Sequence, residues 1–201
     1  MTTLGVTGGI GSGKSAACRM FEDLGARVVY ADAEAKRLMH EHPELRAAIA
    51  DAFGAESYDA SGALNRPYLA NRVFGDEAQL AKLNALVHPR VREAFFELRD
   101  AAEAEGYDLF VYEAALIYES GADRVLDYVA VVDAPLETRI ERVMARDGVP
   151  REAVLARMQH QMPADELRRR ADFVIENDGD LAHLRAQVQT LYRELTTAEQ
   201  A

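Results

Sequence analysis

The 201-residue sequence contains a single cysteine, no tryptophan and few aromatic residues, which make up 7% of the chain. Cys18 has no second cysteine with which to form an internal disulfide, and a cysteine-rich metal site is excluded. We therefore expect a cytoplasmic protein. With so few aromatic rings, a broad surface for stacking nucleic-acid bases is not expected.

Basic residues are also in short supply, because 23 Lys and Arg face 34 Asp and Glu, which gives a formal net charge of −11. So acidic a chain is not expected to bind nucleic acids or anionic membranes in general. A site for phosphate groups must then be a local basic pocket.

Long apolar runs are absent as well: no stretch of about 18 uncharged apolar residues could span a membrane. The first residues, MTTLGVTGG, lack the basic and apolar segments of a signal peptide. The composition, with 49% hydrophobic and 28% charged residues, is typical of a globular chain. Its length suits one compact domain with insertions.

Short apolar runs alternate with helical patterns along the chain. The runs predict five strands, at residues 4–7, 27–30, 109–112, 128–132 and 173–175. A first helix is predicted from Lys14 to the glycine at position 25. A last helix is expected from about Asp180, burying Leu181, Leu184, Val188, Leu191 and Leu195. Apolar strands joined by helices indicate a parallel sheet that is covered on both faces.

Two stretches are too long to be simple connections. Residues 33–106 separate the second and third strands, where roughly a dozen residues would suffice. We interpret them as a helical insertion with turns at His42-Pro43, Ser61-Gly62 and His88-Pro89. Residues 135–170 form a second helical stretch, called here the lid segment. Residues 1–32, 107–134 and 171–201 then make the nucleotide-binding core.

The residues Gly8-Gly9-Ile10-Gly11-Ser12-Gly13-Lys14-Ser15 match the pattern G-x-x-x-x-G-K-[ST] in full, and we call them the phosphate loop. Glycines allow the backbone to aim several N–H groups inward, and the following helix adds partial positive charge. Lys14 would bridge the β- and γ-phosphates of ATP, and the Ser15 hydroxyl would coordinate Mg²⁺. The residues alone thus predict a Mg-ATP phosphotransferase with a small acceptor.

Other interpretations of the glycine-rich stretch are weaker. Gly11-x-Gly13-x-x-Ala16, followed by Asp32 after the second strand, also fits a dinucleotide-binding fold. That fold, like a purely structural glycine turn, leaves the Lys-Ser pair unexplained. A GTPase would need Asn-Lys-x-Asp, and the nearest string, NDGD at 177–180, lacks the lysine.

Three arginines form a stripe at helical spacing. Arg139, Arg142 and Arg146 lie on one face of the helix predicted from Pro135, and no acidic residue is three or four positions from any of them. The stripe is either a solvated face or a site that a polyphosphate neutralises when a lid closes, and we favour the latter. The arginine run 168–170 lies near acidic residues and is expected at the surface.

Strand ends supply further candidates. Asp32 could accept the proton of an attacking hydroxyl or could cap a helix starting at Ala33, and the spacing leaves both roles open. Glu113 ends the third strand, where a Walker-B-like acid, a helix cap or an ion-pair partner would each fit. His88 precedes Pro89 at a predicted helix start, where it could cap or pack. The five histidines have no metal-ligand spacing, so no zinc site is expected.

Taken together, these strings resemble the dephospho-coenzyme A kinase family along nearly the whole chain. The resemblance is carried by residues 7–15, Ala31-Asp32 with Ala35, Leu83-Asn84, His88-Pro89 with Val91, residues 116–121, Arg142, Arg146-Asp147-Gly148, Gln161-Met162, Ala171-Asp172 and Asn177-Asp178-Gly179. The chain departs from the family pattern at Ala16, Tyr30, Ala114-Ala115 and Arg139, where glutamine is frequent.

The resemblance implies a three-layer P-loop kinase fold with a five-stranded parallel sheet, a helical coenzyme-A-binding insertion and a lid. It implies transfer of the ATP γ-phosphoryl group to the ribose 3′-hydroxyl of dephospho-coenzyme A, the last step of coenzyme A synthesis. We expect a monomer or weak homo-oligomer. Another P-loop kinase of small molecules or nucleoside monophosphates is the alternative activity. A nucleotide sensor without turnover is the third hypothesis.

The expected site has three groups of residues. Catalysis is assigned to Lys14, Asp32 and Arg142. ATP binding is assigned to Gly9, Ile10, Gly11, Ser12, Gly13, Lys14, Ser15, Ala16, Arg142, Arg146 and Asn177, with Asn177 near the adenine as the resemblance implies. Contacts to the acceptor are assigned to Thr7, Asp32, His88, Arg90, Glu113 and Glu119.

Overall fold

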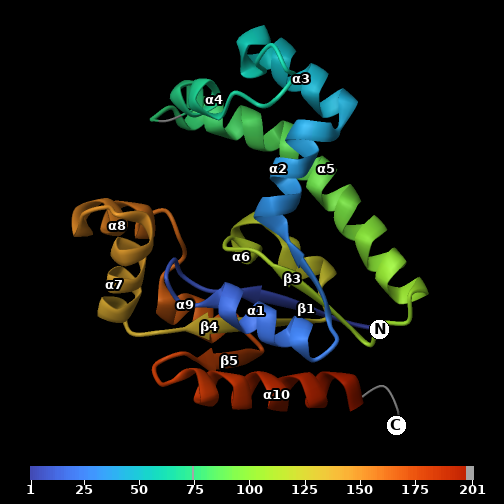
Figure 1. Cartoon of the computed structure of the whole chain (residues 1–201), viewed down its shortest axis with the longest axis vertical. Coiled ribbons are helices and arrows are strands. Elements are labelled where there is room, and N and C mark those ends of the chain that lie inside the picture. The colour runs from blue at the N-terminus through green and yellow to red at the C-terminus, as the bar shows by residue number, and fades with distance from the viewer. Residues whose placement is uncertain (74, 198–201) are drawn as a thin grey trace. The chain divides into compact units, whose positions relative to one another are not determined.

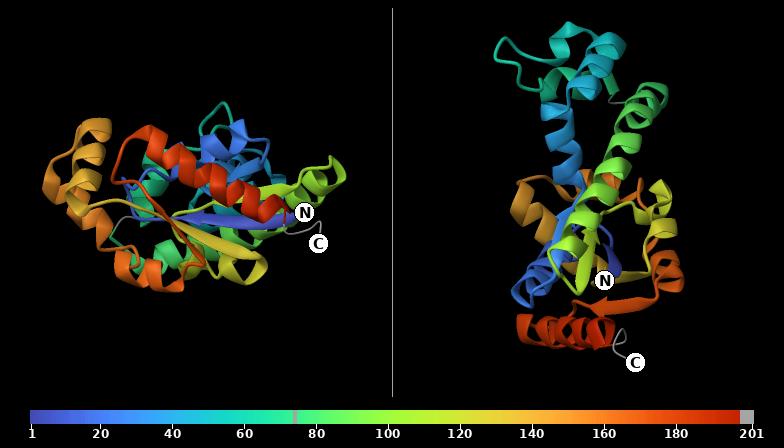
Figure 2. Two further views of the ribbon diagram at one scale, coloured as in Figure 1. Left: turned by 90° about the horizontal axis from the view of Figure 1, so that it is seen from below. Right: turned by 90° about the vertical axis from the view of Figure 1, so that its right-hand side faces the viewer.

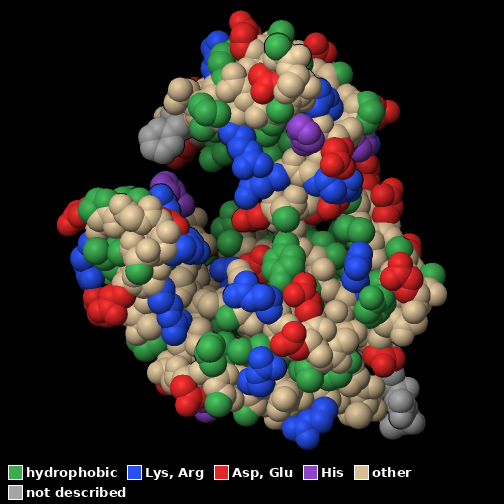
Figure 3. All heavy atoms as spheres, viewed as in Figure 1, with side chains coloured by type: hydrophobic (Ala, Val, Ile, Leu, Met, Phe, Trp, Pro, Cys, Tyr) green, Lys and Arg blue, Asp and Glu red, His purple; other side chains and the backbone are tan. Residues whose placement is uncertain are grey.

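The computed structural model describes residues 1–73 and 75–197 (Figure 1). The chain forms two compact units, Met1–Tyr30 with Ala101–Ala201, and Ala31–Asp100. On the face drawn in Figure 3, acidic and basic side chains are interspersed on the surface of each unit. The net negative charge is therefore not gathered into one patch on that face.

A five-stranded parallel sheet is the centre of the first unit. The strands are β1 (Thr2–Thr7), β2 (Arg27–Tyr30), β3 (Leu109–Glu113), β4 (Tyr128–Asp133) and β5 (Phe173–Glu176). Their order is β2-β3-β1-β4-β5, and each neighbouring pair is parallel. All five predicted strands and their parallel arrangement are confirmed. Because the strands are parallel, their carboxyl ends share one edge, where ligands bind in open α/β folds.

Helices α1 (Lys14–Asp23) and α10 (Leu181–Thr197) cover one face of the sheet (Figure 2). Alternate strand residues point toward them, since side chains along a strand alternate between the two faces. This core comprises Leu4, Val6, Leu109, Val111, Ala130, Val132 and Ile175 with Phe21, Leu184, Val188, Leu191 and Leu195 of the helices. The expected burial of Leu181 is wrong: this residue is at the first position of α10 and is 69% exposed.

The opposite face of the sheet is covered by α6 (Ile117–Ser120) and α9 (Ala164–Arg170) (Figure 2). A Cβ built on Gly5 would lie 2.7 Å from Leu126 and 2.9 Å from Ile117, so glycine permits this close packing. The sheet is thus the middle of three layers, and the predicted fold class is confirmed.

The lid segment contains three helices: α7 (Leu136–Asp147), α8 (Arg151–Met158) and α9. Helix α7 begins one residue after Pro135. A small apolar cluster of Ile140, Val143 and Val154 joins α7 to α8, and Ile10 of the phosphate loop packs against it. This packing makes the loop and α7 neighbours.

The second unit is helical, as predicted for the insertion. Its helices are α2 (Ala31–Glu41), α3 (Pro43–Phe53), the 3₁₀ turn η1 (Ala55–Ser57), α4 (Arg66–Val73) and α5 (Glu77–Ala104, of which residues 101–104 belong to the first unit). The core holds Leu38, Leu45, Ile49, Phe53, Leu69, Val87 and Ala94. The turns at 42–43 and 61–62 are confirmed, and His42 caps α3 by accepting from Leu45 N–H at 3.3 Å.

The predicted turn and helix start at His88-Pro89 are wrong. Both residues lie inside α5, a continuous helix of 28 residues. Proline removes one backbone donor inside a helix and usually ends or kinks it. Here Val87 and Ala94, on either side of Pro89, are buried in the core of the second unit, and this packing overrides the local preference.

Candidate active site

The phosphate loop connects the end of β1 to the start of α1, as its sequence predicts. Gly11 and Gly13 have φ angles of +80° and +100°, which side chains rarely adopt. A Cβ on Gly13 would also lie 2.1 Å from the side-chain nitrogen of Asn177. Both the backbone conformation and the close approach of Asn177 therefore require glycine at position 13.

Several backbone N–H groups of the phosphate loop have no hydrogen-bond acceptor among the described residues. Among the described residues, none accepts a hydrogen bond from the backbone N–H of Gly11, Gly13 or Ser15. The first N–H groups of a helix have no partner within it and favour an anion at that end. The loop can thus receive a phosphate group at the start of α1.

Lys14 and Ser15 occupy the first turn of α1. The Lys14 ammonium donates a hydrogen bond to the carbonyl oxygen of Gly8 at 2.8 Å, so its side chain folds back over the loop. Ser15 is exposed, and no described residue forms a hydrogen bond with its hydroxyl. This oxygen is open to a hard cation.

Asn177 and Arg142 both form hydrogen bonds with the backbone of the phosphate loop. Asn177, which follows β5 and is buried, donates from its side-chain amide to the Ser12 carbonyl oxygen at 2.7 Å. Arg142 of α7 reaches the same oxygen at 3.5 Å and the Asn177 carbonyl at 3.4 Å. The backbone N–H of Asn177 is fixed in turn by the Asp133 carbonyl at 2.7 Å. A residue after a strand and a residue of the lid segment thus donate to the same carbonyl of the loop, that of Ser12.

Two contacts to the loop were not assigned to the site from the sequence. Arg139, the first member of the arginine stripe, is buried and donates from Nε to the Ile10 carbonyl at 3.2 Å. Gln161 accepts from the Ile10 N–H at 2.8 Å. Burial lowers the pKa of the Arg139 guanidinium from its ordinary value, although arginine stays charged. The stripe spacing pointed to Arg139, whereas nothing in the local sequence of Gln161 indicates its role.

Arg146 is directed elsewhere. Its side chain is 62% exposed and pairs with Asp147 at 2.7 Å, and Asp147 also accepts from Arg157 of α8 at 2.7 Å. Hydrogen bonds from Arg146 first, and then Arg157, lower the pKa of the Asp147 carboxyl to about 2. The stripe is therefore divided between two buried or loop-facing arginines and one that lies in a surface ion pair.

The remaining candidates of the first unit lie on β1, β3 and α6. Thr7 is buried at the end of β1 and donates to the Ala115 carbonyl at 3.4 Å. Glu113 is the last residue of β3, beside Val6 of β1. Glu119 of α6 accepts from the Met162 N–H at 3.0 Å and so touches the lid segment.

Asp32, His88 and Arg90 lie in the second unit. Asp32 is exposed in the first turn of α2, which begins at Ala31, so its proposed role as a cap of a helix starting at Ala33 is wrong. No described residue forms a hydrogen bond with its carboxylate. His88 is exposed on α5, and Arg90 pairs with Glu44 at 2.6 Å and with Glu93 at 2.8 Å.

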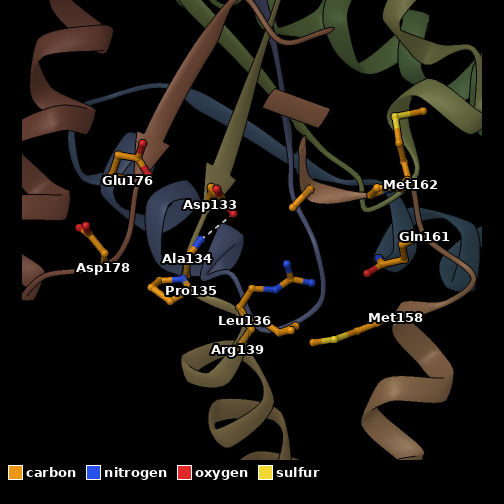
Figure 4. Close-up of a pocket in the computed structure, with 12 residues that line it drawn as sticks. Asp133, Ala134, Pro135, Leu136, Arg139, Met158, Gln161, Met162, Glu176 and Asp178 are labelled. Carbon is orange, nitrogen blue, oxygen red and sulfur yellow. Dashed lines mark hydrogen bonds between the residues drawn. The ribbon is translucent and has the colours of Figure 1, made fainter. Parts of the chain in front are cut away.

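A cavity of about 470 Å³ lies beyond the carboxyl ends of β4 and β5, against the lid segment (Figure 4). Arg139, Gln161 and Met158 point into it from the lid segment. Two of the residues that line it, Asp133 and Glu176, form ion pairs with Arg168 at 2.8 Å and 2.7 Å. The surface location predicted for residues 168–170 is confirmed, since the Arg168 side chain is 38% exposed while it pairs with these two acids and Arg169 and Arg170 are exposed.

Within residues 1–73 and 75–197, no three His, Cys, Asp or Glu side chains group to hold a metal ion. Cys18 is buried in the core as predicted, and burial raises the pKa of its thiol above the usual range. None of the helices in the described part of the chain is long and apolar enough to cross a membrane.

The sheet order distinguishes the candidate folds. In the dinucleotide-binding fold the second strand pairs with the first, but here β3 lies between β1 and β2. The end of β2, and Asp32 after it, is thus displaced by one strand from the glycine-rich turn. The dinucleotide interpretation is therefore wrong.

Comparisons with known proteins agree with the rejection of the dinucleotide-binding fold. The dephospho-CoA kinase family profile matches residues 2–183. A dephospho-CoA kinase of Salinibacter ruber is 53% identical over 196 residues, covering 98% of each chain. A Thermus thermophilus crystal structure is 38% identical with a TM-score of 0.80, covering 97% of this chain and 98% of its own. The dephospho-CoA kinase structure from Campylobacter jejuni is 25% identical with a TM-score of 0.67, covering 98% of both. The chain therefore belongs to the dephospho-CoA kinase family.

Proposed function

We propose that this protein transfers the γ-phosphoryl group of ATP to the ribose 3′-hydroxyl of dephospho-coenzyme A, giving coenzyme A and ADP. The observation that carries the proposal is the phosphate loop, with open N–H donors at the start of α1, in a chain that matches this family over residues 2–183. Phosphoryl transfer needs mainly positioning and neutralisation of charge, which a preformed loop supplies.

On the ATP side, the loop of residues 9–16 would receive the phosphates through the open amides of Gly11, Gly13 and Ser15, and Lys14 would turn from Gly8 to the β- and γ-phosphates. Arg142 would neutralise the transferring group, because it already reaches the loop from α7. Asn177, beside Ser12, would lie near the adenine. Arg146 would reach a phosphate only after leaving Asp147, which assigns it to a closed lid.

The donor set at Ser15 fits Mg²⁺. This ion prefers oxygen ligands, keeps several waters, and is bound through one or two protein oxygens together with substrate phosphates. The exposed Ser15 hydroxyl offers one such oxygen, and no cage of protein carboxylates exists among the described residues. When bound, Mg²⁺ would neutralise the charge of the phosphates. Ser15 would hold it.

On the acceptor side, Asp32 would orient the 3′-hydroxyl or accept its proton. Thr7, His88, Arg90, Glu113 and Glu119 would line the acceptor site. The division into a core (residues 1–32, 107–134 and 171–201), a coenzyme-A-binding insertion (33–106) and a lid (135–170) belongs to this proposal. So do the cytoplasmic location, the monomeric or weakly oligomeric state and the lack of nucleic-acid binding.

The test is to offer ATP and Mg²⁺ with dephospho-coenzyme A, a set of nucleoside monophosphates, or shikimate, and to measure ADP. We expect ADP with dephospho-coenzyme A, together with a product that carries the new phosphate at the ribose 3′ position. ADP with another acceptor alone would favour a different small-molecule kinase. ATP binding with no ADP above background for any acceptor would favour a nucleotide sensor.

A further inference from the structure

One residue of the phosphate loop is held by side chains on both sides of its backbone. The Ile10 N–H donates to Gln161 at 2.8 Å, and the Ile10 carbonyl accepts from Arg139 at 3.2 Å. Arg139 is on the first half of α7, whereas Gln161 follows α8. Two distant parts of the lid segment therefore meet at one residue of the loop.

Arg139 is an unusual residue to find there. It is only 8% exposed, and no described carboxylate lies within ion-pair distance of it, although the charge of Asp133 favours its charged form. A buried guanidinium without a directly paired carboxylate is costly, so its position needs a compensating interaction. The phosphate loop packs closely against it. A Cβ on Gly9 would lie 2.3 Å from Arg139 Nη2, and a Cβ on Gly11 would lie 2.4 Å from the Arg139 carbonyl oxygen. Residues 9–11 thus lie directly against α7.

We propose that Arg139 and Gln161 are positioning residues that hold the phosphate loop in the shape that receives the polyphosphate of ATP. This inference rests on the proposed function. A glycine-rich loop has many accessible conformations, and ordering it on binding would weaken the affinity for nucleotide. Fixing the backbone N–H and C=O of Ile10 holds the two peptide groups on either side of this residue, and this removes much of the freedom before ATP arrives. Neither side chain needs to touch the acceptor.

The test compares Arg139→Leu, Gln161→Leu and the double variant with the wild type. The readouts are KM for ATP, KM for dephospho-coenzyme A, and the dissociation constant of ADP measured by calorimetry without acceptor. Each single change should raise KM for ATP and the ADP dissociation constant about tenfold, as expected for the loss of one hydrogen bond. KM for dephospho-coenzyme A should stay within about twofold. The double variant should be little worse than the worse single, because both side chains act through the backbone of the same residue, Ile10.

Two further variants separate positioning from other causes. Arg151→Leu removes an arginine of the same segment that pairs with Glu137 on the surface, and it should bind ADP like the wild type. Arg139→Gln keeps a side-chain N–H donor without charge and should restore most of the affinity. Restoration by Arg139→Lys but not by Arg139→Gln would overturn the proposal in favour of simple charge attraction.

Unchanged ADP affinity in both single variants, with a lower urea midpoint, would also overturn the proposal, since it would mean that the residues only pack. Should Arg139→Leu fail to fold, Gln161→Leu at its half-buried position keeps the comparison available. ADP binding is independent of the acceptor. A wild-type protein that ignores dephospho-coenzyme A would therefore refute the proposed function and leave this test intact.

Discussion

The side-chain amide of Asn177 donates a 2.7 Å hydrogen bond to the carbonyl oxygen of Ser12, which joins the end of β5 to the phosphate loop. Asn177→Ala should leave this buried carbonyl poorly satisfied and lower the free energy of unfolding by about 1–3 kcal/mol. KM for ATP should rise as well, because the loop loses its support. Urea unfolding and steady-state kinetics measure both, with the exposed neighbour changed in Asp178→Ala as the control. Equal stability and KM in the two variants would contradict the assigned role.

Lys14→Ala should abolish most of the turnover while the chain stays folded. The ammonium stabilises the charge of the transferring group, and loss of such a donor costs about a hundredfold or more in kcat. Arg19→Ala removes a positive charge from the exposed side of the same helix and serves as the matched control. The assignment of the phosphate loop fails if Lys14→Ala keeps near-full activity in a steady-state assay.

Arg142→Ala should lower turnover by about tenfold or more, because a positive charge near the transferring group is lost. Its hydrogen bonds to the Ser12 carbonyl of the loop, at 3.5 Å, and to the Asn177 carbonyl, at 3.4 Å, are long, so the urea midpoint should hardly change. Arg146→Ala should also slow turnover, through the closed lid. A collapse of stability with full activity in the remaining folded fraction would make these arginines structural.

The ion pairs of Asp147 give a pH dependence with a defined sign. Arg146 and Arg157 lower the pKa of this carboxyl to about 2 in the folded state, against about 3.9 in an unfolded chain. A carboxyl with a depressed pKa stabilises the fold above its unfolded pKa, and the contribution is lost as the pH falls through the folded one. The stability gap between the wild type and Asp147→Asn should thus be constant from pH 7 to about 4. It should shrink toward pH 2 in urea titrations, and a gap that widens would refute the pairing.

The variant Asp32→Asn tests whether the carboxylate of this residue takes part in the reaction. Because Asp32 lies in the first turn of α2 and forms no hydrogen bond with a described residue, the change should cost no more than about 1 kcal/mol of stability, through the helix dipole. ADP should still bind. Turnover should fall about a hundredfold if the carboxylate orients or deprotonates the acceptor hydroxyl. Asp51→Asn, at an exposed acid of the same unit, is the control. Wild-type turnover would instead direct attention to Glu113.

Much of the first unit could be predicted because its information is local. Each strand is a short apolar run, and the phosphate loop needs glycines, a lysine and a serine at fixed spacing within eight residues. The observed strands agree with the predicted ones to within two residues at either end. The burial of Cys18 followed from its place on the first helix. In these segments the residues that determine the structure are neighbours in the chain.

The rest was decided by tertiary packing. The order that inserts β3 between β1 and β2 depends on which strands pair, and no strand sequence encodes its neighbour. Helix α5 continues through Pro89 because packing within its unit outweighs the local preference for a break. Gln161 bonds Ile10 across 151 positions of sequence, and Arg139 does so across 129. The sequence gives the chemical nature of each side chain. Its hydrogen-bond partners, and whether water is excluded around it, depend on residues that are distant in the chain and that only the tertiary structure brings together.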